Sequence, residues 1–144
     1  MTTTGSPLQV IEAFWTLIER GELDRLADYV HPDADAIVPG GLRVTGPDEL
    51  RPVLQAYLTA FPTLRHHTIT AIESGDQAAV ELHVEVTHSG PFVTPHGELS
   101  PTGNHFVIES CDVIRVTDGR IASWHAYGDT AALMANLAPT AARA

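Results

Sequence analysis

Residues 103–129 read GNHFVIESCDVIRVTDGRIASWHAYGD. Two runs rich in Val, Ile and aromatic residues flank Thr117-Asp118-Gly119, a turn signal that commonly joins neighbouring antiparallel strands. We therefore expect a long β-hairpin. Its side chains include the ionisable and phenolic groups that a proton-transfer site needs, namely Asp112, His125, Tyr127 and Asp129.

The first half of this hairpin places a carboxyl group on an apolar face. The even positions of residues 104–116 are the more apolar ones, and Asp112 lies among them. A carboxyl group in such surroundings is expected to have a raised pKa, which suits it to donate or shuttle a proton near neutral pH. The alternative is a buried structural Asp that hydrogen-bonds to the backbone or to a loop.

The second half of the hairpin is harder to orient, because both of its faces are mixed. His125 and Tyr127 share one side, where they can orient an enolate or relay a proton if that side faces a pocket. Trp124 then packs on the other side, in the core or in a dimer contact. Asp129 opens Asp-Thr-Ala-Ala-Leu, an ordinary helix N-cap, and a capping carboxylate is a weak base.

Upstream of the hairpin, the apolar periodicity changes from helical to extended. In residues 77–88 the even positions are apolar, which predicts a strand, and residues 64–73 form its partner across a turn. Helices are expected from Ser6-Pro7 to Gly21, over 22–30, and from Thr45-Gly46-Pro47 to Pro62. The remaining predictions are a short strand at 36–38, a loop at 89–102 and a closing helix at 129–137.

This order predicts an α+β fold, a cone-shaped curved antiparallel sheet with three N-terminal helices packed on its concave face. The length of 144 residues suits a single domain, 1–144, with 1–6 and 138–144 as flexible tails. Such a cone encloses a pocket. The candidates for binding a substrate in it are Phe14, Trp15, Tyr57, His66, His88, Phe106 and Tyr127.

The composition excludes several function classes. Eight Lys and Arg against 18 Asp and Glu give a net charge of −10, so we expect neither nucleic acid nor a membrane as a partner. The start of the chain lacks the features of a signal peptide, which predicts a cytoplasmic location. The 8 histidines form no HExxH or Cys-His set, so we expect no metal and no cofactor.

Several local motifs accompany this order of elements. They are Ala60-Phe61-Pro62 followed by Leu64-Arg65-His66, Thr87-His88-Ser89-Gly90-Pro91-Phe92, Pro101-Thr102-Gly103, Val113-Ile114-Arg115-Val116 through Asp118-Gly119-Arg120-Ile121, and Trp124, Asp129, Leu133 and Leu137. Over residues 7–137 the chain thereby resembles the nuclear-transport-factor-two-like superfamily, and within it the SnoaL-like polyketide cyclases.

The resemblance implies a cofactor-free enzyme of secondary metabolism, as in antibiotic biosynthesis, that closes a ring in a hydrophobic polyketide-like carbonyl substrate by an intramolecular aldol reaction. It places the general acid/base at Asp129, the end of the last strand. Asp129 then removes a proton next to a carbonyl, while Asp112, His125 or Tyr127 holds the developing enolate.

Other relatives of this fold leave alternatives open. The ketosteroid isomerases place an oxyanion-donating Asp near Asp112, but their general base falls at Val38 and their phenolic donor at Phe14. Epoxide hydrolases of this fold also use carboxylates. Val38 stands at the position where one of these carboxylates is expected. A dehydratase, or a non-catalytic module that binds small molecules or other proteins, is the remaining alternative. By analogy with the fold, we expect a homodimer.

Overall fold

The computed structural model describes residues 5–138, so the predicted tails at 1–6 and 138–144 lie largely outside the described residues. The N-terminal part contains α1 (Pro7–Glu19), the 3₁₀ helix η1 (Leu23–Asp28), β1 (Val30–Ile37), β2 (Arg43–Thr45) and α2 (Gly46–Ala60). The C-terminal part contains β3 (Arg65–Ser74), β4 (Gln77–Thr87), β5 (Phe92–Thr94), β6 (Gly97–Leu99), β7 (His105–Thr117), β8 (Arg120–Gly128) and α3 (Thr130–Leu137).

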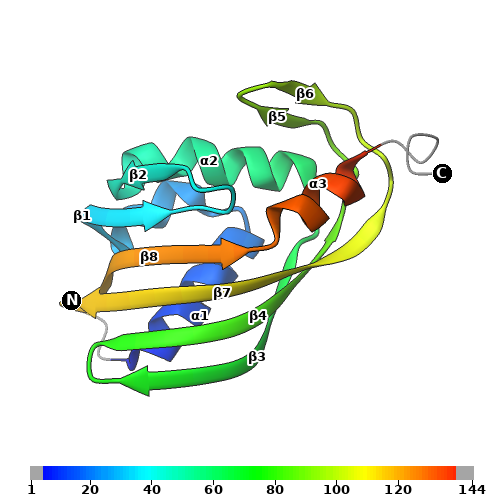
Figure 1. Ribbon diagram of the computed structural model, residues 1–144. Helices are drawn as coiled ribbons and strands as arrows, with labels where there is room; N and C mark the ends of the chain where they lie inside the picture. Colours follow the sequence, from blue (N-terminus) through cyan, green and yellow to red (C-terminus); the bar gives the residue numbers. More distant parts are fainter. Residues whose placement is uncertain (1–4, 139–144) are drawn as a thin grey trace.

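Six strands form one curved sheet in the order β2-β1-β8-β7-β4-β3. Figure 1 shows α1 and α2 on the same face of this sheet, with the β5–β6 hairpin projecting beyond α2. The buried core lies between these helices and the sheet, and its largest fully buried side chains include Phe14, Phe61, Leu82 and Ile114. The predicted α+β fold is therefore confirmed, as is the long hairpin, which is formed by β7 and β8.

The sheet differs from the expectation at β1. This strand begins at Val30 rather than at residue 36, and it runs parallel to β8, so the sheet is mixed. Pro32 lies inside this strand, although proline cannot donate a ladder hydrogen bond. The register between β1 and β8 shifts between Val30 and Asp35, which accommodates Pro32 in an irregular part of the strand.

The helices form where the local signals predict them. Ser6 and Gln9 make a capping box at the start of α1, and Pro7 occupies its first turn. The α1 face that the periodicity predicted to be apolar is buried against the sheet. The second predicted helix is instead the single 3₁₀ segment η1. Among the described residues, no helix is long and apolar enough to cross a membrane.

The predicted loop at 89–102 contains the small hairpin β5–β6, which is anchored at the end of α2. The backbone N–H groups of Ser89 and Gly90 both donate to the Ala60 carbonyl oxygen, each at 3.2 Å. A Cβ atom on Gly90 would overlap the Thr59 carbonyl oxygen. Glycine is therefore required here because two backbone segments approach each other closely.

We expect Gly90→Ala to lower the free energy of unfolding by about 2 kcal/mol or more, because the Thr59 carbonyl belongs to the backbone and cannot move aside cheaply. Ser89→Ala is the matched control: its side chain is exposed and its backbone donor remains, so its effect should stay within about 0.5 kcal/mol. Urea denaturation measures both. Equal stabilities for the two variants would contradict the close approach.

Candidate active site

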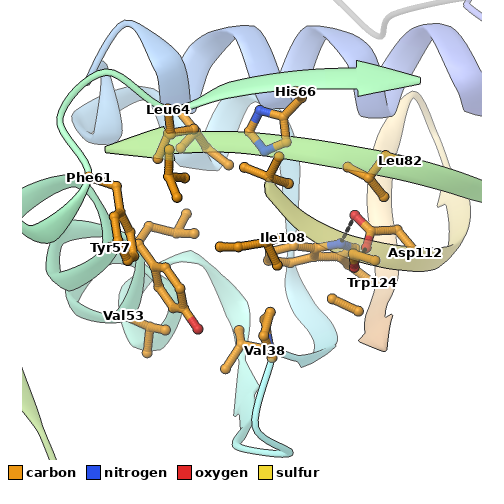
Figure 2. A pocket seen from close by; sticks show the side chains of 17 residues that line it. Val38, Val53, Tyr57, Phe61, Leu64, His66, Leu82, Ile108, Asp112 and Trp124 are labelled. Carbon is orange, nitrogen blue, oxygen red and sulfur yellow. Dashed lines mark hydrogen bonds between the residues drawn. The ribbon is translucent and has the colours of Figure 1, made fainter. Parts of the chain in front are cut away.

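A cavity of about 80 Å³, which is partly open to solvent, lies between α2 and the concave face of the sheet. Its walls are mostly apolar, with side chains such as Val38, Leu82 and Ile108. Figure 2 shows Tyr57, His66 and Asp112 on different sides of it, with Trp124 next to Asp112. A largely apolar cavity with a few polar groups is the usual architecture of a small-molecule site.

Asp112 is the most deeply buried acidic group of this cavity, with 2% of its surface exposed. The Trp124 indole N–H donates to Asp112 Oδ2 at 2.9 Å, and the Ser110 hydroxyl donates to Oδ1 at 3.0 Å. Burial raises the pKa of the Asp112 carboxyl, and these two hydrogen bonds offset the increase only in part. Asp112 therefore keeps its proton to a higher pH than an exposed carboxyl group does.

Ser110 can support both protonation states of Asp112. Its hydroxyl lies 3.0 Å from Asp112 Oδ1 and 3.2 Å from the Tyr127 carbonyl oxygen. When Asp112 is ionised, the hydroxyl donates to the carboxylate. When Asp112 is protonated, its O–H can donate to Ser110, whose own proton then turns to the Tyr127 carbonyl. Neither state leaves a buried polar group without a partner.

His66 lies on another wall, where Glu19 fixes its ring. Glu19 Oε2 accepts from the His66 backbone N–H at 2.7 Å and lies 2.9 Å from His66 Nδ1. Burial acts to raise the pKa of Glu19, but the hydrogen bonds and charge of His66 outweigh it and the net pKa is lowered. Trp15 stacks on the opposite side of the imidazole, at 5.1 Å between ring centroids and 2° between planes.

The predicted pocket residues are divided between the cavity wall and the packing behind it. Tyr57 and His66 line the cavity. Phe14 packs edge-on against Trp124 at 5.3 Å, and Phe106 packs against Phe61 at 6.0 Å. Two more candidates, Trp15 and His88, are also buried behind the wall; each has one ring nitrogen with no hydrogen-bond partner among the described residues.

On β8 the inward face is the one that the sequence analysis did not favour. Trp124 and Ala126 line the cavity, while His125 and Tyr127 lie on the outer face of the sheet. His125 Nε2 lies 2.9 Å from Asp35 Oδ2, and Tyr127 is 53% exposed. The sequence did not predict this orientation, because both faces of the strand have a mixed composition. The large side chain of Trp124 packs in the core and sets the orientation of the strand.

Asp129 lies outside the cavity. It is the N-cap of α3, its Oδ1 accepts from the Ala132 backbone N–H at 2.9 Å, and its side chain is exposed. These contacts are those of an ordinary helix cap. The structure thus brings Asp112 into the cavity and leaves Asp129 at its periphery.

Two residues of the site were missed by the sequence analysis, although each carries a detectable signal. Glu19 follows Ile11 and Trp15 at intervals of four, so it lies on the buried face of α1. Ser110 has the same parity on β7 as Asp112 and therefore shares its face. A polar residue in a predicted apolar stripe was the available clue in both cases.

Two further histidines of the sheet, His67 and His105, pair with Glu85 on its outer face. Glu85 Oε1 lies 3.3 Å from His67 Nε2, and Glu85 Oε2 lies 3.0 Å from His105 Nε2. Within residues 5–138, no three His, Cys, Asp or Glu side chains gather so that they could hold a metal ion. Because these pairs are exposed, they contribute little to stability.

We expect the free energy of unfolding to depend on the titration of Asp112. The folded pKa is raised above the unfolded value of about 3.9, so between the two values the native state holds a proton that the unfolded chain has lost. The stability due to the neutral carboxyl is fully present below the unfolded pKa and is lost as pH rises through the folded pKa.

Asp112→Asn removes this titration. The stability of the variant relative to the wild type should therefore increase from about pH 4 upward, by as much as ~1.4 kcal/mol per pH unit within that window. Urea denaturation at a series of pH values measures the difference. A difference that stays constant with pH would show that Asp112 titrates alike in the folded and unfolded states.

The profile of the SnoaL-like polyketide cyclase family matches residues 8–137. Among solved structures, IdmH from Streptomyces antibioticus, described as a candidate polyketide cyclase, is 25% identical, with a TM-score of 0.76 over 92% of this chain and 99% of that one. A candidate SnoaL-like cyclase from Jannaschia sp. CCS1 is 16% identical, with a TM-score of 0.79 over 91% and 90%.

An epoxide hydrolase of Mycobacterium tuberculosis is 17% identical, with a TM-score of 0.68 over 91% of this chain and 88% of that one. No curated protein sequence matches the chain significantly. Similarities at such identities carry the fold and not the reaction. The family match, in contrast, extends from α1 to α3 and includes every strand of the sheet. The chain therefore belongs to the SnoaL-like polyketide cyclase family.

Proposed function

We propose that this protein is a cofactor-independent acid/base enzyme that acts on a hydrophobic carbonyl compound, with intramolecular aldol ring closure of a polyketide-like substrate as its reaction. One observation carries the proposal: Asp112 is an almost fully buried carboxyl group on the wall of an apolar cavity, held there by Trp124 and Ser110. Buried carboxyl groups with raised pKa values gather at functional sites.

Asp112 acts on the substrate oxygen. As a neutral carboxyl it donates a hydrogen bond to the carbonyl, and this bond strengthens as negative charge develops on the oxygen in the transition state. The Trp124 indole N–H fixes the carboxyl in place, so little reorganisation is needed when the charge forms. The apolar walls exclude water, which increases the energetic effect of each polar contact.

The cavity indicates the class of substrate. Its apolar walls favour a hydrophobic compound, such as one with fused rings or an extended conjugated chain. Tyr57 adds a second polar group, and burial raises its pKa to about 12, so it remains a phenol that can donate a hydrogen bond. A substrate with more than one oxygen function fits this arrangement.

The outer face of the sheet supports the proposal that two copies associate. Val107, Val113 and Tyr127 are 46%, 40% and 53% exposed on the side opposite the helices. Apolar side chains on a sheet face favour burial against a partner. Sedimentation equilibrium at micromolar concentration should give the mass of a dimer, and Val113→Glu should shift the equilibrium toward the monomer. A monomeric mass for the wild type would contradict this proposal.

Exchange of α-protons tests the proposed activity without knowledge of the natural substrate. We expect the wild-type protein to accelerate the exchange of the α-protons of 2-tetralone, a bicyclic ketone, with D₂O, followed by ¹H NMR. Asp112→Asn should reduce the acceleration about 100-fold or more, because the amide cannot donate a proton to the enolate oxygen. An absence of acceleration by the wild type would favour a non-catalytic binding protein.

Asp129→Asn is the comparison variant. Asn caps helices about as well as Asp, so α3 should remain intact, and the exchange rate should stay within about twofold of the wild type. If Asp129→Asn abolished the exchange and Asp112→Asn did not, the acid/base group would lie at the helix cap, and the assignment to Asp112 would be wrong.

A further inference from the structure

The proposed reaction needs a base as well as an acid, and Asp129 lies outside the cavity. The other ionisable groups on its wall are Tyr57 and His66, and the raised pKa of Tyr57 keeps it a phenol. We propose that His66 is the base that takes a proton from the substrate, and that Glu19 is the positioning residue that orients it. This inference rests on the function proposed above.

Glu19 determines which nitrogen of His66 carries the proton. Its lowered pKa keeps it a carboxylate, which can only accept, so Nδ1 at 2.9 Å must be the N–H donor. In the neutral ring Nε2 then carries the free lone pair. Figure 2 shows one ring nitrogen of His66 on the cavity side, and Nε2 makes no hydrogen bond within residues 5–138. A basic nitrogen thus faces the space where a substrate binds.

The orientation of the ring is fixed from two sides. Glu19 also accepts the His66 backbone N–H at 2.7 Å, which ties the carboxylate to the same residue whose ring it orients. Trp15 stacks flat on the imidazole, so rotation about its side-chain bonds would lose this contact. A flat aromatic face and an adjacent carboxylate both stabilise the cation that forms when Nε2 takes a proton.

His66 also lies between the apolar cavity and the exterior. A second, polar cleft on the far side of the ring is lined by Glu12, Thr16 and Glu19, and His66 borders both spaces. A proton taken from the substrate can therefore reach solvent through the Glu19 side of the ring. Such a route lets a buried base exchange its proton with solvent, which the exchange of α-protons with D₂O requires.

The two groups complete the ring closure without any further reactant. The bond between the α-carbon and its hydrogen breaks, the proton goes to His66 Nε2, and the electron pair forms the enol while Asp112 protonates the first carbonyl oxygen. The enol carbon then bonds to a second carbonyl of the same molecule. The oxygen of that carbonyl takes the proton from the imidazolium, and Asp112 recovers its own proton from the enol oxygen.

A purely structural role is the competing explanation, because the Glu19 contact also joins α1 to β3. The tautomer of His66 distinguishes the positioning role of Glu19 from a purely structural one. It depends on which ring nitrogen is hydrogen-bonded and not on the stability of the fold. We expect ¹⁵N NMR of the wild type to show the Nδ1–H tautomer. In Glu19→Ala the ring should shift to the Nε2–H form, whereas Glu19→Gln keeps an acceptor and should retain Nδ1–H.

The exchange of 2-tetralone protons tests the catalytic role. His66→Asn keeps an amide donor near the position of Nδ1 but has no basic nitrogen, so the rate should fall about 100-fold. The exchange rate should fall about tenfold in Glu19→Ala and no more than about threefold in Glu19→Gln, because only the alanine variant leaves the imidazole ring without its acceptor. His67→Asn is the matched control, an exposed neighbour on the other face of β3, and should leave the rate unchanged.

The outcomes distinguish the inference from the function on which it rests. If Asp112→Asn loses the exchange while His66→Asn retains it, the acid/base function stands and the role of His66 is wrong. A wild-type Nε2–H tautomer would likewise overturn the role of Glu19, whatever the exchange rates. If the wild-type protein does not accelerate exchange at all, the proposed function itself fails.

Discussion

The burial of one carboxyl group in an apolar cavity is the constraint on which the rest of the site depends. Removing Asp112 from water disfavours its charged form, and an isolated buried carboxylate would be costly. Trp124 and Ser110 limit that cost with two hydrogen bonds, and the hydroxyl of Ser110 can turn to suit either protonation state. The fold therefore stabilises a group whose protonation can change without leaving polar atoms unpaired.

Strand pairing holds these groups together. Asp112 faces Ala126 and Ile114 faces Trp124 across β7 and β8, so Asp112 and Trp124 are diagonal neighbours on one face of the sheet. Shifting the register of β8 by one residue would move Trp124 to the outer face and away from Asp112. The site is thus built on two long strands that stay in register from Ser110 to Arg115.

The hairpin followed from two runs rich in Val and Ile on either side of a turn signal, and the inward position of Asp112 followed from the alternation of residues 104–116. The side of β8 that faces the cavity did not, because parity assigns faces only when one face is clearly apolar. The parallel pairing of β1 with β8 and the contact of Glu19 with His66 join residues far apart in the chain. Local patterns carry no information about which distant segments become neighbours, so only the structure could reveal them.

The central claim is that Asp112 is a carboxyl group whose burial prepares it for proton transfer. The most direct test is a titration of its side-chain carboxyl carbon by ¹³C NMR, in the folded protein and in the urea-unfolded chain. We expect the pKa in the folded protein to lie above the unfolded value of about 3.9. A folded pKa at or below the unfolded value would mean that the carboxylate is stabilised in its charged form, and would contradict the account.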